Sequence, residues 1–361
     1  MKIDAGLVGN QRRRGRGART NVSGRYETET REDIDDGWSS LEDLEPFRTH
    51  VQVEAAKSII STNTSPDLSF DQSINPYRGC EHGCSYCYAR PNHTYMGLSA
   101  GLDFETRLFA KTNAADLLRK ELAAPRYQPK TIALGAVTDP YQPIERTHKI
   151  SRAILEVLDE TSHPVAIVTK SALVTRDIDI LSRLAERGLA KVALSITSLD
   201  RTVARKMEPR ASTPSKRLDA IRQLTDAGIP ATVMTAPIIP SLNDWEIERI
   251  LEAARDAGAT QAGYVLLRLP HEIKHLFREW LVTEFPDRAD RVINLLREMR
   301  GGKDYDTTWG RRQTGQGPYA MQIKARYKLA LRRLGMNNRH FGLRTDLFEP
   351  PVLKGGQMRL L

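Results

Sequence analysis

The three cysteines of the chain are its most informative residues, because Cys80, Cys84 and Cys87 all lie on one short stretch. Their spacing is C-x3-C-x2-C, and Gly79 and Gly83 allow the backbone to turn tightly around them. Three thiolates on one loop can hold three corners of a cubane iron–sulfur cluster. A fourth cysteine would close such a cluster, and the chain has none. One iron would therefore stay open to an external ligand.

Two other interpretations of the cysteines stay open from the residues alone. A zinc site of the Cys3His type would take His82 or His93 as its fourth ligand. Buried cysteines without a metal would behave as small hydrophobic residues, but these three stand among Gly, His, Glu and Ser. The loop also follows a predicted strand, which favours a site of chemistry.

Apolar and β-branched runs that alternate with helix-like stretches predict six strands of a parallel sheet. The runs are Leu68–Ile74, Thr131–Val137, Pro164–Thr169, Ala190–Ile196, Pro230–Pro237 and Ala262–Leu267. Helix-like stretches include Asn113–Leu122, Ser151–Asp159 and Thr175–Arg187, with Gly188 and Gly228 placed to end helices. No G-x-G-x-x-G follows the first strand, so an α/β fold with a partial (β/α)6 barrel is favoured. In a barrel, chemistry belongs on loops at the C-terminal ends of the strands.

Charge divides the chain into segments, although the formal net charge is +9 overall. Residues 1–55 lack apolar periodicity and are expected to form a disordered arm, whose Arg12–Arg16 run is either solvated or in contact with phosphates. Residues 66–285 are expected to form the barrel. Residues 286–361 carry 16 Lys or Arg against 7 Asp or Glu and are expected to form a basic helical extension. The sequence contains neither a long apolar run nor an apolar leader, so we expect a cytoplasmic protein without a membrane span.

The cysteine spacing, with an aromatic residue before the last cysteine, resembles the radical S-adenosylmethionine superfamily. The resemblance implies that Cys80, Cys84 and Cys87 ligate a 4Fe–4S cluster and that S-adenosylmethionine chelates the fourth iron. A reduced cluster would then split the cofactor into methionine and a 5′-deoxyadenosyl radical. The protein would supply ligation, orientation and protection from side reactions. The same resemblance implies an electron donor of the flavodoxin or ferredoxin type.

From about Ser73 to Tyr319 the chain is similar to the spore photoproduct lyase-like branch, which is also described as DNA repair photolyase-like. The similar stretches are Cys84–Tyr88, Ile167–Lys170, Ser195–Ser198, Glu208–Arg210, Arg217–Ala220, Ala236–Ile238 and Trp309–Arg311. Their shared order and spacing carry the resemblance.

This resemblance implies that S-adenosylmethionine lies near Tyr86, Lys170 and Ser195. Lys170 would pair with the cofactor's carboxylate as a compact cation; otherwise it is a surface lysine. Arg210 would be a second anion-binding group. Asp139 would accept from the cofactor's ammonium group; otherwise it is a turn or cap residue.

One position departs from the lyase pattern. A cysteine near the end of the second strand donates a hydrogen atom in the lyase, and Val137 stands at that place here. With all three cysteines assigned to the cluster, no thiol remains for this step. Tyr88 matches a tyrosine of the lyase's radical relay and is the catalytic candidate; otherwise it is a packing aromatic. A different substrate, or a donor based on tyrosine or on the substrate, is therefore expected.

A Gly-rich stretch near the C-terminus supplies the candidate substrate-binding residues Trp309, Arg311, Arg312 and Tyr319. Stacking faces and cations on flexible backbone are the groups that hold a nucleic-acid strand and a displaced base. A loop over the barrel mouth, followed by an amphipathic helix, is the other interpretation. We predict a radical enzyme that acts on nucleic acid. The alternatives are a radical modifier of a protein or small anion, and a non-catalytic, zinc-stabilised nucleic-acid-binding protein.

Overall fold

A computed structural model describes residues 13–27, 46–338 and 342–352, and its main feature is a seven-stranded sheet. The strands are β2 (Ile60–Thr62), β3 (Gln72–Ile74), β6 (Ile132–Leu134), β7 (Val165–Thr169), β8 (Ala190–Ser195), β9 (Ala231–Ile238) and β10 (Gln261–Leu266). Their order is β10-β9-β8-β7-β6-β3-β2, and every neighbouring pair is parallel except the edge pair β2 and β3. All six predicted strands are confirmed, although the first two are shorter than expected.

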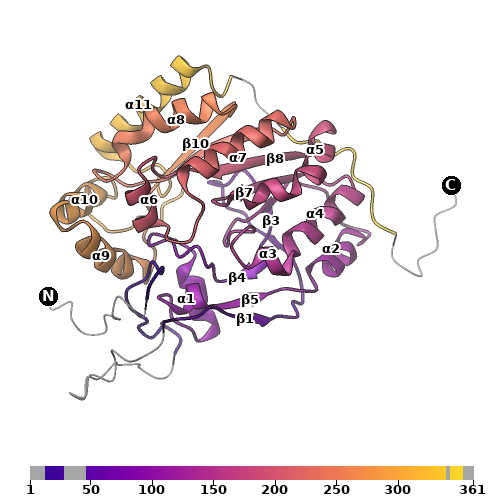
Figure 1. Cartoon of the computed structure of the whole chain (residues 1–361), viewed down its shortest axis with the longest axis horizontal. Helices are drawn as coiled ribbons and strands as arrows, with labels where there is room; N and C mark the ends of the chain where they lie inside the picture. The colour runs from indigo at the N-terminus through magenta and orange to yellow at the C-terminus, as the bar shows by residue number, and fades with distance from the viewer. Residues whose placement is uncertain (1–12, 28–45, 339–341, 353–361) are drawn as a thin grey trace.

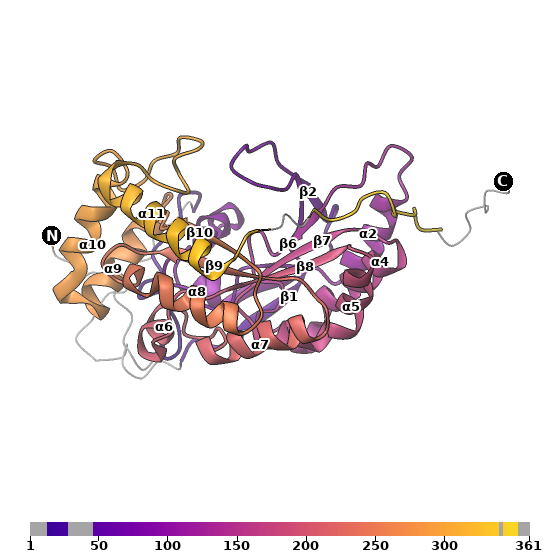
Figure 2. The ribbon, with the colours of Figure 1, turned by 90° about the horizontal axis from the view of Figure 1, so that it is seen from above.

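Helices cover one side of this sheet, as Figure 2 shows. They are α2 (Ala114–Leu122), α4 (Ile150–Glu160), α5 (Ile178–Glu186), α7 (Pro214–Asp226) and α8 (Ile247–Asp256). Gly188 and Gly228 follow α5 and α7 with φ of +72° and +76°, which a residue with a Cβ rarely adopts. Strands β2 and β10 do not pair with each other in the described part of the chain. The partial (β/α)6 barrel is therefore confirmed.

A second, smaller sheet lies beside the start of the barrel (Figure 1). It consists of β1 (His50–Val53), β5 (Arg107–Ala110) and β4 (Tyr77–Arg78), in that order. The short helices are η1 (Arg90–Met96), α1 (Asp103–Thr106), α3 (Glu145–His148), η2 (Ala172–Asp177), α6 (Arg201–Met207) and η3 (Asp244–Glu246). Because β4 follows β3 almost directly, the small sheet and the barrel together hold the loop that carries the cysteines.

Three further helices follow the last strand: α9 (Ile273–Glu284), α10 (Pro286–Glu298) and α11 (Gly317–Leu334). Helix α9 packs against α10, and α11 packs against α8 and α10 (Figure 1). The predicted boundary between the barrel, residues 66–285, and the basic extension, residues 286–361, falls between α9 and α10. These two helices are in contact, and the boundary stays a prediction. In the described part of the chain, no helix has the length and apolar character that crossing a membrane requires.

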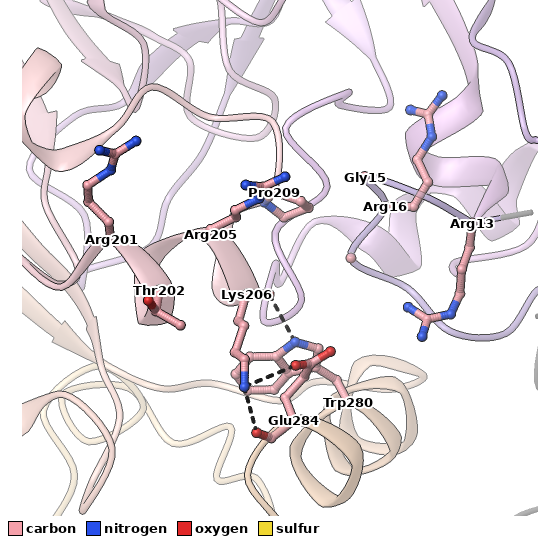
Figure 3. A pocket seen from close by; sticks show the side chains of 11 residues that line it. Arg13, Gly15, Arg16, Arg201, Thr202, Arg205, Lys206, Pro209, Trp280 and Glu284 are labelled. Atoms are coloured by element: carbon pink, nitrogen blue, oxygen red, sulfur yellow. Dashed lines mark hydrogen bonds and ion pairs between the residues drawn. The ribbon is translucent and has the colours of Figure 1, made fainter. Parts of the chain in front are cut away.

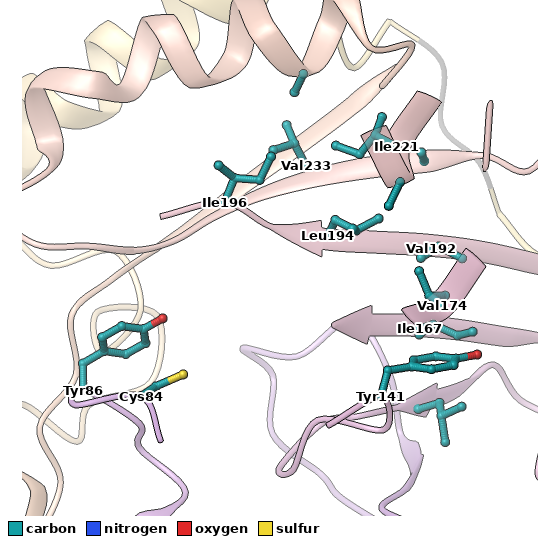
Figure 4. Packing of buried hydrophobic residues seen from close by; sticks show 14 of the residues in the cluster. Cys84, Tyr86, Tyr141, Ile167, Val174, Val192, Leu194, Ile196, Ile221 and Val233 are labelled. Atoms are coloured by element: carbon teal, nitrogen blue, oxygen red, sulfur yellow. The ribbon is translucent and has the colours of Figure 1, made fainter. Parts of the chain in front are cut away.

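Buried aliphatic side chains fill the space between the sheet and its helices. Ile167, Leu194 and Val233 come from three adjacent strands and meet Ile221 of α7 (Figure 4). Each such side chain contributes roughly 1.5–3 kcal/mol when fully buried. Figure 4 also shows Cys84 and Tyr86 side by side, and both belong to the same apolar cluster. The core therefore anchors the cysteine-bearing loop directly.

Part of the expected disordered arm packs onto the core. Residues 1–12 and 28–45 of that arm lie outside the described residues, whereas residues 13–27, here called the N-terminal segment, and residues 46–55 are described. The second stretch contains strand β1, which pairs with β5, so it is not disordered as expected. Arg16, Arg19 and Thr20 are 5%, 6% and 2% exposed. The expectation of a solvated tail is therefore wrong for these residues, because carboxylates from distant parts of the chain pair with their charges.

Candidate active site

The cysteine loop, residues 79–88, bends at two glycines as the sequence predicted. Gly79 and Gly83 have φ of +71° and +67°. The N–H of Cys80 donates to the carbonyl of Phe104 at 2.9 Å, and the N–H of Cys87 to the carbonyl of Cys84 at 3.3 Å. Burial raises the pKa of the Cys80 thiol well above its usual value, and the neighbouring thiols of Cys84 and Cys87 add to this. The three thiols therefore lie close enough to influence one another, and Cys80 and Cys84 are buried while Cys87 is partly exposed.

The two histidines that a Cys3His zinc site would use both face other partners. Within residues 13–27, 46–338 and 342–352, no three His, Cys, Asp or Glu side chains gather as one metal ion requires. The ring of His93 is engaged instead, with Nε2 at 2.9 Å from the carbonyl of Arg107. Nδ1 of His82 lies 3.3 Å from Oδ2 of Asp139. Both histidines therefore interact with groups other than the cysteines.

Asp139 lies at the centre of the strand ends. Its Oδ1 accepts from the hydroxyl of Thr169 at 2.6 Å and from the N–H of Tyr141 at 2.9 Å. Its Oδ2 accepts from the N–H of Lys170 at 2.7 Å and faces His82. Burial alone would raise the pKa of Asp139, but His82 and these hydrogen bonds lower it to about 2. Because three donors already occupy the carboxylate and His82 faces it, its geometry favours holding the loops together over accepting from a cofactor.

Tyr86 is tied to a buried ion pair that joins the cysteine loop to β8. Its hydroxyl donates to Glu208, which also accepts from Thr197 at 2.9 Å and pairs with Arg217. Arg217 in turn donates to the carbonyl of Ser195, the last residue of β8, at 2.8 Å. Burial alone would raise the pKa of Glu208, but Arg217 and other neighbours lower it. The carboxylate therefore stays ionised at neutral pH.

Lys170 directly follows β7 and carries a cation without a dedicated partner. Its Nζ lies 5.8 Å from the centre of the Tyr86 ring. Among the described residues, no hydrogen-bond acceptor or ion-pair partner is found for this ammonium group. Burial alone would lower the pKa of Lys170, but Cys84 and Glu208 raise it. Lys170 and Ser195 lie at the C-terminal ends of the adjacent strands β7 and β8. The structure thus brings them together with Tyr86 of the cysteine loop.

A second buried ion pair connects the cysteine loop to the N-terminal segment. Arg90 pairs with Glu105, and both side chains are at most 1% exposed. Nε of Arg90 donates to the carbonyl of Cys84 at 2.9 Å. The carboxylate of Glu105 accepts from the N–H groups of Gly17 and Ala18 at 2.9 and 2.7 Å. Neither residue was predicted from the sequence, because each acts through partners that are distant along the chain.

Arg210 also holds the N-terminal segment, which differs from the predicted cofactor contact. Its guanidinium group pairs with Glu81 of the cysteine loop and donates to the carbonyl of Gly15 at 3.2 Å. Arg16 donates to the carbonyl of Glu105 at 3.0 Å and lies 3.9 Å from Glu81. These contacts favour a positioning role for Arg210, in which it joins the segment to the loop.

Gly17 provides a direct test of this contact. A Cβ at Gly17 would lie 1.7 Å from the carbonyl oxygen of Gly83, so the backbone of the cysteine loop would have to move. We expect Gly17→Ala to destabilise the fold by about 1–3 kcal/mol, as overpacking does, and to lower the iron retained after anaerobic reconstitution. The measurements are thermal unfolding and iron per chain during exposure to a chelator. Gly342→Ala is the matched control, because nothing lies within 4 Å of its added Cβ. Equal iron retention in the two variants would contradict the role of the segment.

A cavity of about 560 Å³ opens between the N-terminal segment, α6 and α9. Most of its charged lining residues are cations: Arg13, Arg16, Arg201, Arg205 and Lys206, with Glu284 as the carboxylate. Figure 3 shows Lys206 turned toward Glu284, whereas the guanidinium groups of Arg201 and Arg205 point away from it. The surface beside the cysteine loop is therefore positively charged.

Tyr88 and Val137 both lie close to Cys87. Tyr88 is half-exposed, and its hydroxyl donates to the carbonyl of Ala136. The side chain of Val137 packs in the small apolar cluster of Cys80 and Cys87. The position at which the lyase would carry a cysteine thus borders the cysteine loop and holds an aliphatic side chain.

The four candidate substrate-binding residues differ in their surroundings. Trp309 is 61% exposed, and Arg311 is exposed as well. Arg312 instead pairs with Asp67 in the connection between β2 and β3, and Tyr319 donates to Asp244. The first two are open to a ligand, whereas the internal partners of the last two favour a structural role.

The fold and the site together define a class of protein: a parallel partial barrel whose first strand leads into a C-x3-C-x2-C loop. A family model described as the Radical SAM superfamily matches residues 74–254. The chain belongs to this superfamily. It is therefore an enzyme, and the alternative of a non-catalytic zinc-stabilised protein is wrong. The superfamily uses a 4Fe–4S cluster and S-adenosylmethionine, as the resemblance implied.

Similar proteins include uncharacterised and enzymatic relatives. An uncharacterised protein of Mycobacterium tuberculosis is 36% identical over 64% of this chain and 68% of its own length. A protein of Pseudomonas phage M6 named radical SAM Nalpha-GlyT isomerase is 24% identical over 74% of this chain and 53% of its own. Among solved structures, spore photoproduct lyase complexed with dinucleoside spore photoproduct is similar with a TM-score of 0.56, 16% identity and 79% coverage of both chains. This last similarity concerns the fold.

Proposed function

We propose that the protein is a radical S-adenosylmethionine enzyme that acts on nucleic acid without a cysteine hydrogen donor. The observation that carries the proposal is the cysteine loop beside an exposed aromatic and cationic rim. Tyr88 and Trp309 are 45% and 61% exposed, and Arg311, two positions after Trp309, is exposed as well; these three residues are here called the rim. Aromatic faces and arginines are the groups on which bases stack and phosphates bind.

Cys80, Cys84 and Cys87 would hold the cluster, and Tyr86, Lys170 and Ser195 would orient S-adenosylmethionine. When bound, the two cofactors supply a 5′-deoxyadenosyl radical that removes a hydrogen atom from the substrate. The ammonium group of Lys170, which has no partner among the described residues, would bind the carboxylate of the cofactor. The ring of Tyr86 lies next to this ammonium group. Asp139 keeps the two loops that carry His82 and Lys170 together. Burial of the cysteine loop under the N-terminal segment limits the access of water.

The choice of nucleic acid draws support from the relatives as well as from the rim. Spore photoproduct lyase, which has a similar fold, was solved with a dinucleoside photoproduct. The lyase reaction itself is not proposed, because Val137 replaces the donor cysteine and the chain has only three cysteines. Tyr88, which lies beside Cys87, is the proposed catalytic residue.

An electron donor of the flavodoxin or ferredoxin type remains expected. The cationic cavity beside the cysteine loop would attract such a donor if it is an acidic protein.

The proposal is tested by asking whether nucleic acid both binds and stimulates the reaction. The reconstituted enzyme, reduced in the presence of S-adenosylmethionine, is mixed with single-stranded DNA, duplex DNA, RNA or no nucleic acid. We expect faster formation of 5′-deoxyadenosine with one of the nucleic acids, and binding that weakens steeply with salt. If no nucleic acid binds or changes the rate, a protein or small anionic substrate replaces it.

A further inference from the structure

Two arginines near the end of β10, Arg268 and Arg300, form no ion pair with a carboxylate in the described part of the chain; Asp67 and Asp306 act on their charges only without direct contact. Nε of each is buried and has no hydrogen-bond partner. Arg300 is 2% exposed and donates only to carbonyls, of Leu267 at 2.7 Å and of Arg311 at 2.9 Å. Burial, together with Arg268, lowers the pKa of Arg300 to about 10, so Arg300 remains cationic at neutral pH. A buried charge without a counter-ion is costly, and an anionic ligand would remove that cost.

The position of Arg268 places this charge beside the cysteine loop. Arg268 follows the last residue of β10 by two positions, at the C-terminal edge of the sheet. Its guanidinium carbon lies 5.2 Å from the centre of the Tyr88 ring, which is a cation–π contact. Because Tyr88 directly follows Cys87, a ligand held by Arg268 would lie next to the site of chemistry.

The second arginine joins Arg268 to the exposed rim. Arg300 holds the carbonyl of Arg311, while the N–H of Gly310 donates to Asp67 at 2.6 Å. These bonds fix the loop that presents Trp309 and the exposed Arg311. The nearby carboxylates are already engaged: Asp67 pairs with Arg312, and Asp306 accepts from the N–H of Thr308 at 2.9 Å. Neither carboxylate forms an ion pair with Arg268 or Arg300.

We propose that Arg268 binds a phosphodiester group of the nucleic-acid strand, with Arg300 as the positioning residue, and thereby seats the adjoining nucleotide between Tyr88 and Trp309. The inference rests on the proposed function and adds the anchor of the substrate. The planar guanidinium group offers several N–H donors, which suits a phosphate better than a stacking role alone. A phosphate at this place would also accept from the exposed Arg311.

The test measures the binding of a labelled single-stranded oligothymidylate to the cluster-loaded enzyme over a range of salt concentrations. Loss of one phosphate contact should lower the slope of log affinity against log salt by about 0.7 for a single strand. We expect Arg268→Met to show this loss and Arg268→Lys, which keeps the charge, to retain the slope. Arg222→Gln on α7 is the control for net charge, because its partner Asp219 is local and the pair is exposed.

The outcomes separate this inference from the proposed function. If the unaltered enzyme binds in a salt-dependent manner and Arg268→Met matches Arg222→Gln, the phosphate anchor is wrong while the proposed function stands. If the unaltered enzyme binds neither DNA nor RNA, both are wrong. Circular dichroism and iron content of Arg268→Met show whether it folds. Should it not fold, Arg268→Gln, which keeps a polar side chain but removes the charge, must still lower the slope by one contact.

Discussion

Replacing Cys84 with alanine is expected to abolish formation of 5′-deoxyadenosine and to lower the iron content of the reconstituted protein. Cys84 supplies one of only three thiols in the chain, and its backbone carbonyl is held by Arg90. Loss of residues that merely orient metal ligands costs about 10- to 100-fold in metal affinity, so loss of a ligand should cost at least about 100-fold. Iron and sulfide per chain, the visible absorption of the cluster and chromatography of the nucleoside product provide the measurements.

His93→Gln is the control that separates a cluster from a zinc site. His93 is 1% exposed, and its Nε2 is engaged by the carbonyl of Arg107 at 2.9 Å, an interaction that an amide can replace. A cluster held by three cysteines should survive this substitution with its iron unchanged. If the Cys84→Ala protein kept full iron and full cofactor cleavage, or if His93→Gln lost its metal completely, the assignment of the three cysteines would be wrong.

The barrel could be predicted from the sequence because its signals are local. Each strand is a short apolar run, and Gly188 and Gly228 mark helix ends by a conformation that other residues rarely adopt. The cysteine loop is equally local, because its spacing alone describes the arrangement of the thiols. Lys170 and Ser195 were placed correctly at one edge, because the C-terminal ends of neighbouring parallel strands lie together.

The remaining features depend on contacts between distant residues. The basic N-terminal run resembles a solvated tail until Glu105 and Glu284 are known to face it. The same limit applies to Arg312, whose partner Asp67 is on another loop, and to Arg268, which is prominent because it forms no ion pair with any described carboxylate. A count of charges cannot distinguish a cation that closes an ion pair from one that awaits a ligand. Only the pairing in space makes that distinction.

Removing one member of the buried pair of Glu208 and Arg217 should have the largest effect on stability. Both side chains are at most 1% exposed, and Arg217 would be left as a buried charge without a counter-ion in Glu208→Leu. Breaking a buried ion pair from one side costs about 3–5 kcal/mol. Urea unfolding under anaerobic conditions measures this loss. Asp219→Asn on the same helix is the matched control; its pair with Arg222 is exposed, so the loss should be under about 1 kcal/mol.

The double variant Glu208→Leu with Arg217→Met separates stability from function. Removing both charges leaves no uncompensated ion, so much of the lost stability should return, as it does when buried ion pairs are replaced by apolar residues. The hydroxyl of Tyr86 would still lack its acceptor, and the carbonyl of Ser195 would lack its donor. Affinity for S-adenosylmethionine, measured by calorimetry on the cluster-loaded protein, should therefore remain low while the stability recovers. Recovery of both would mean that the pair only stabilises the fold, and that the position of Tyr86 does not depend on it.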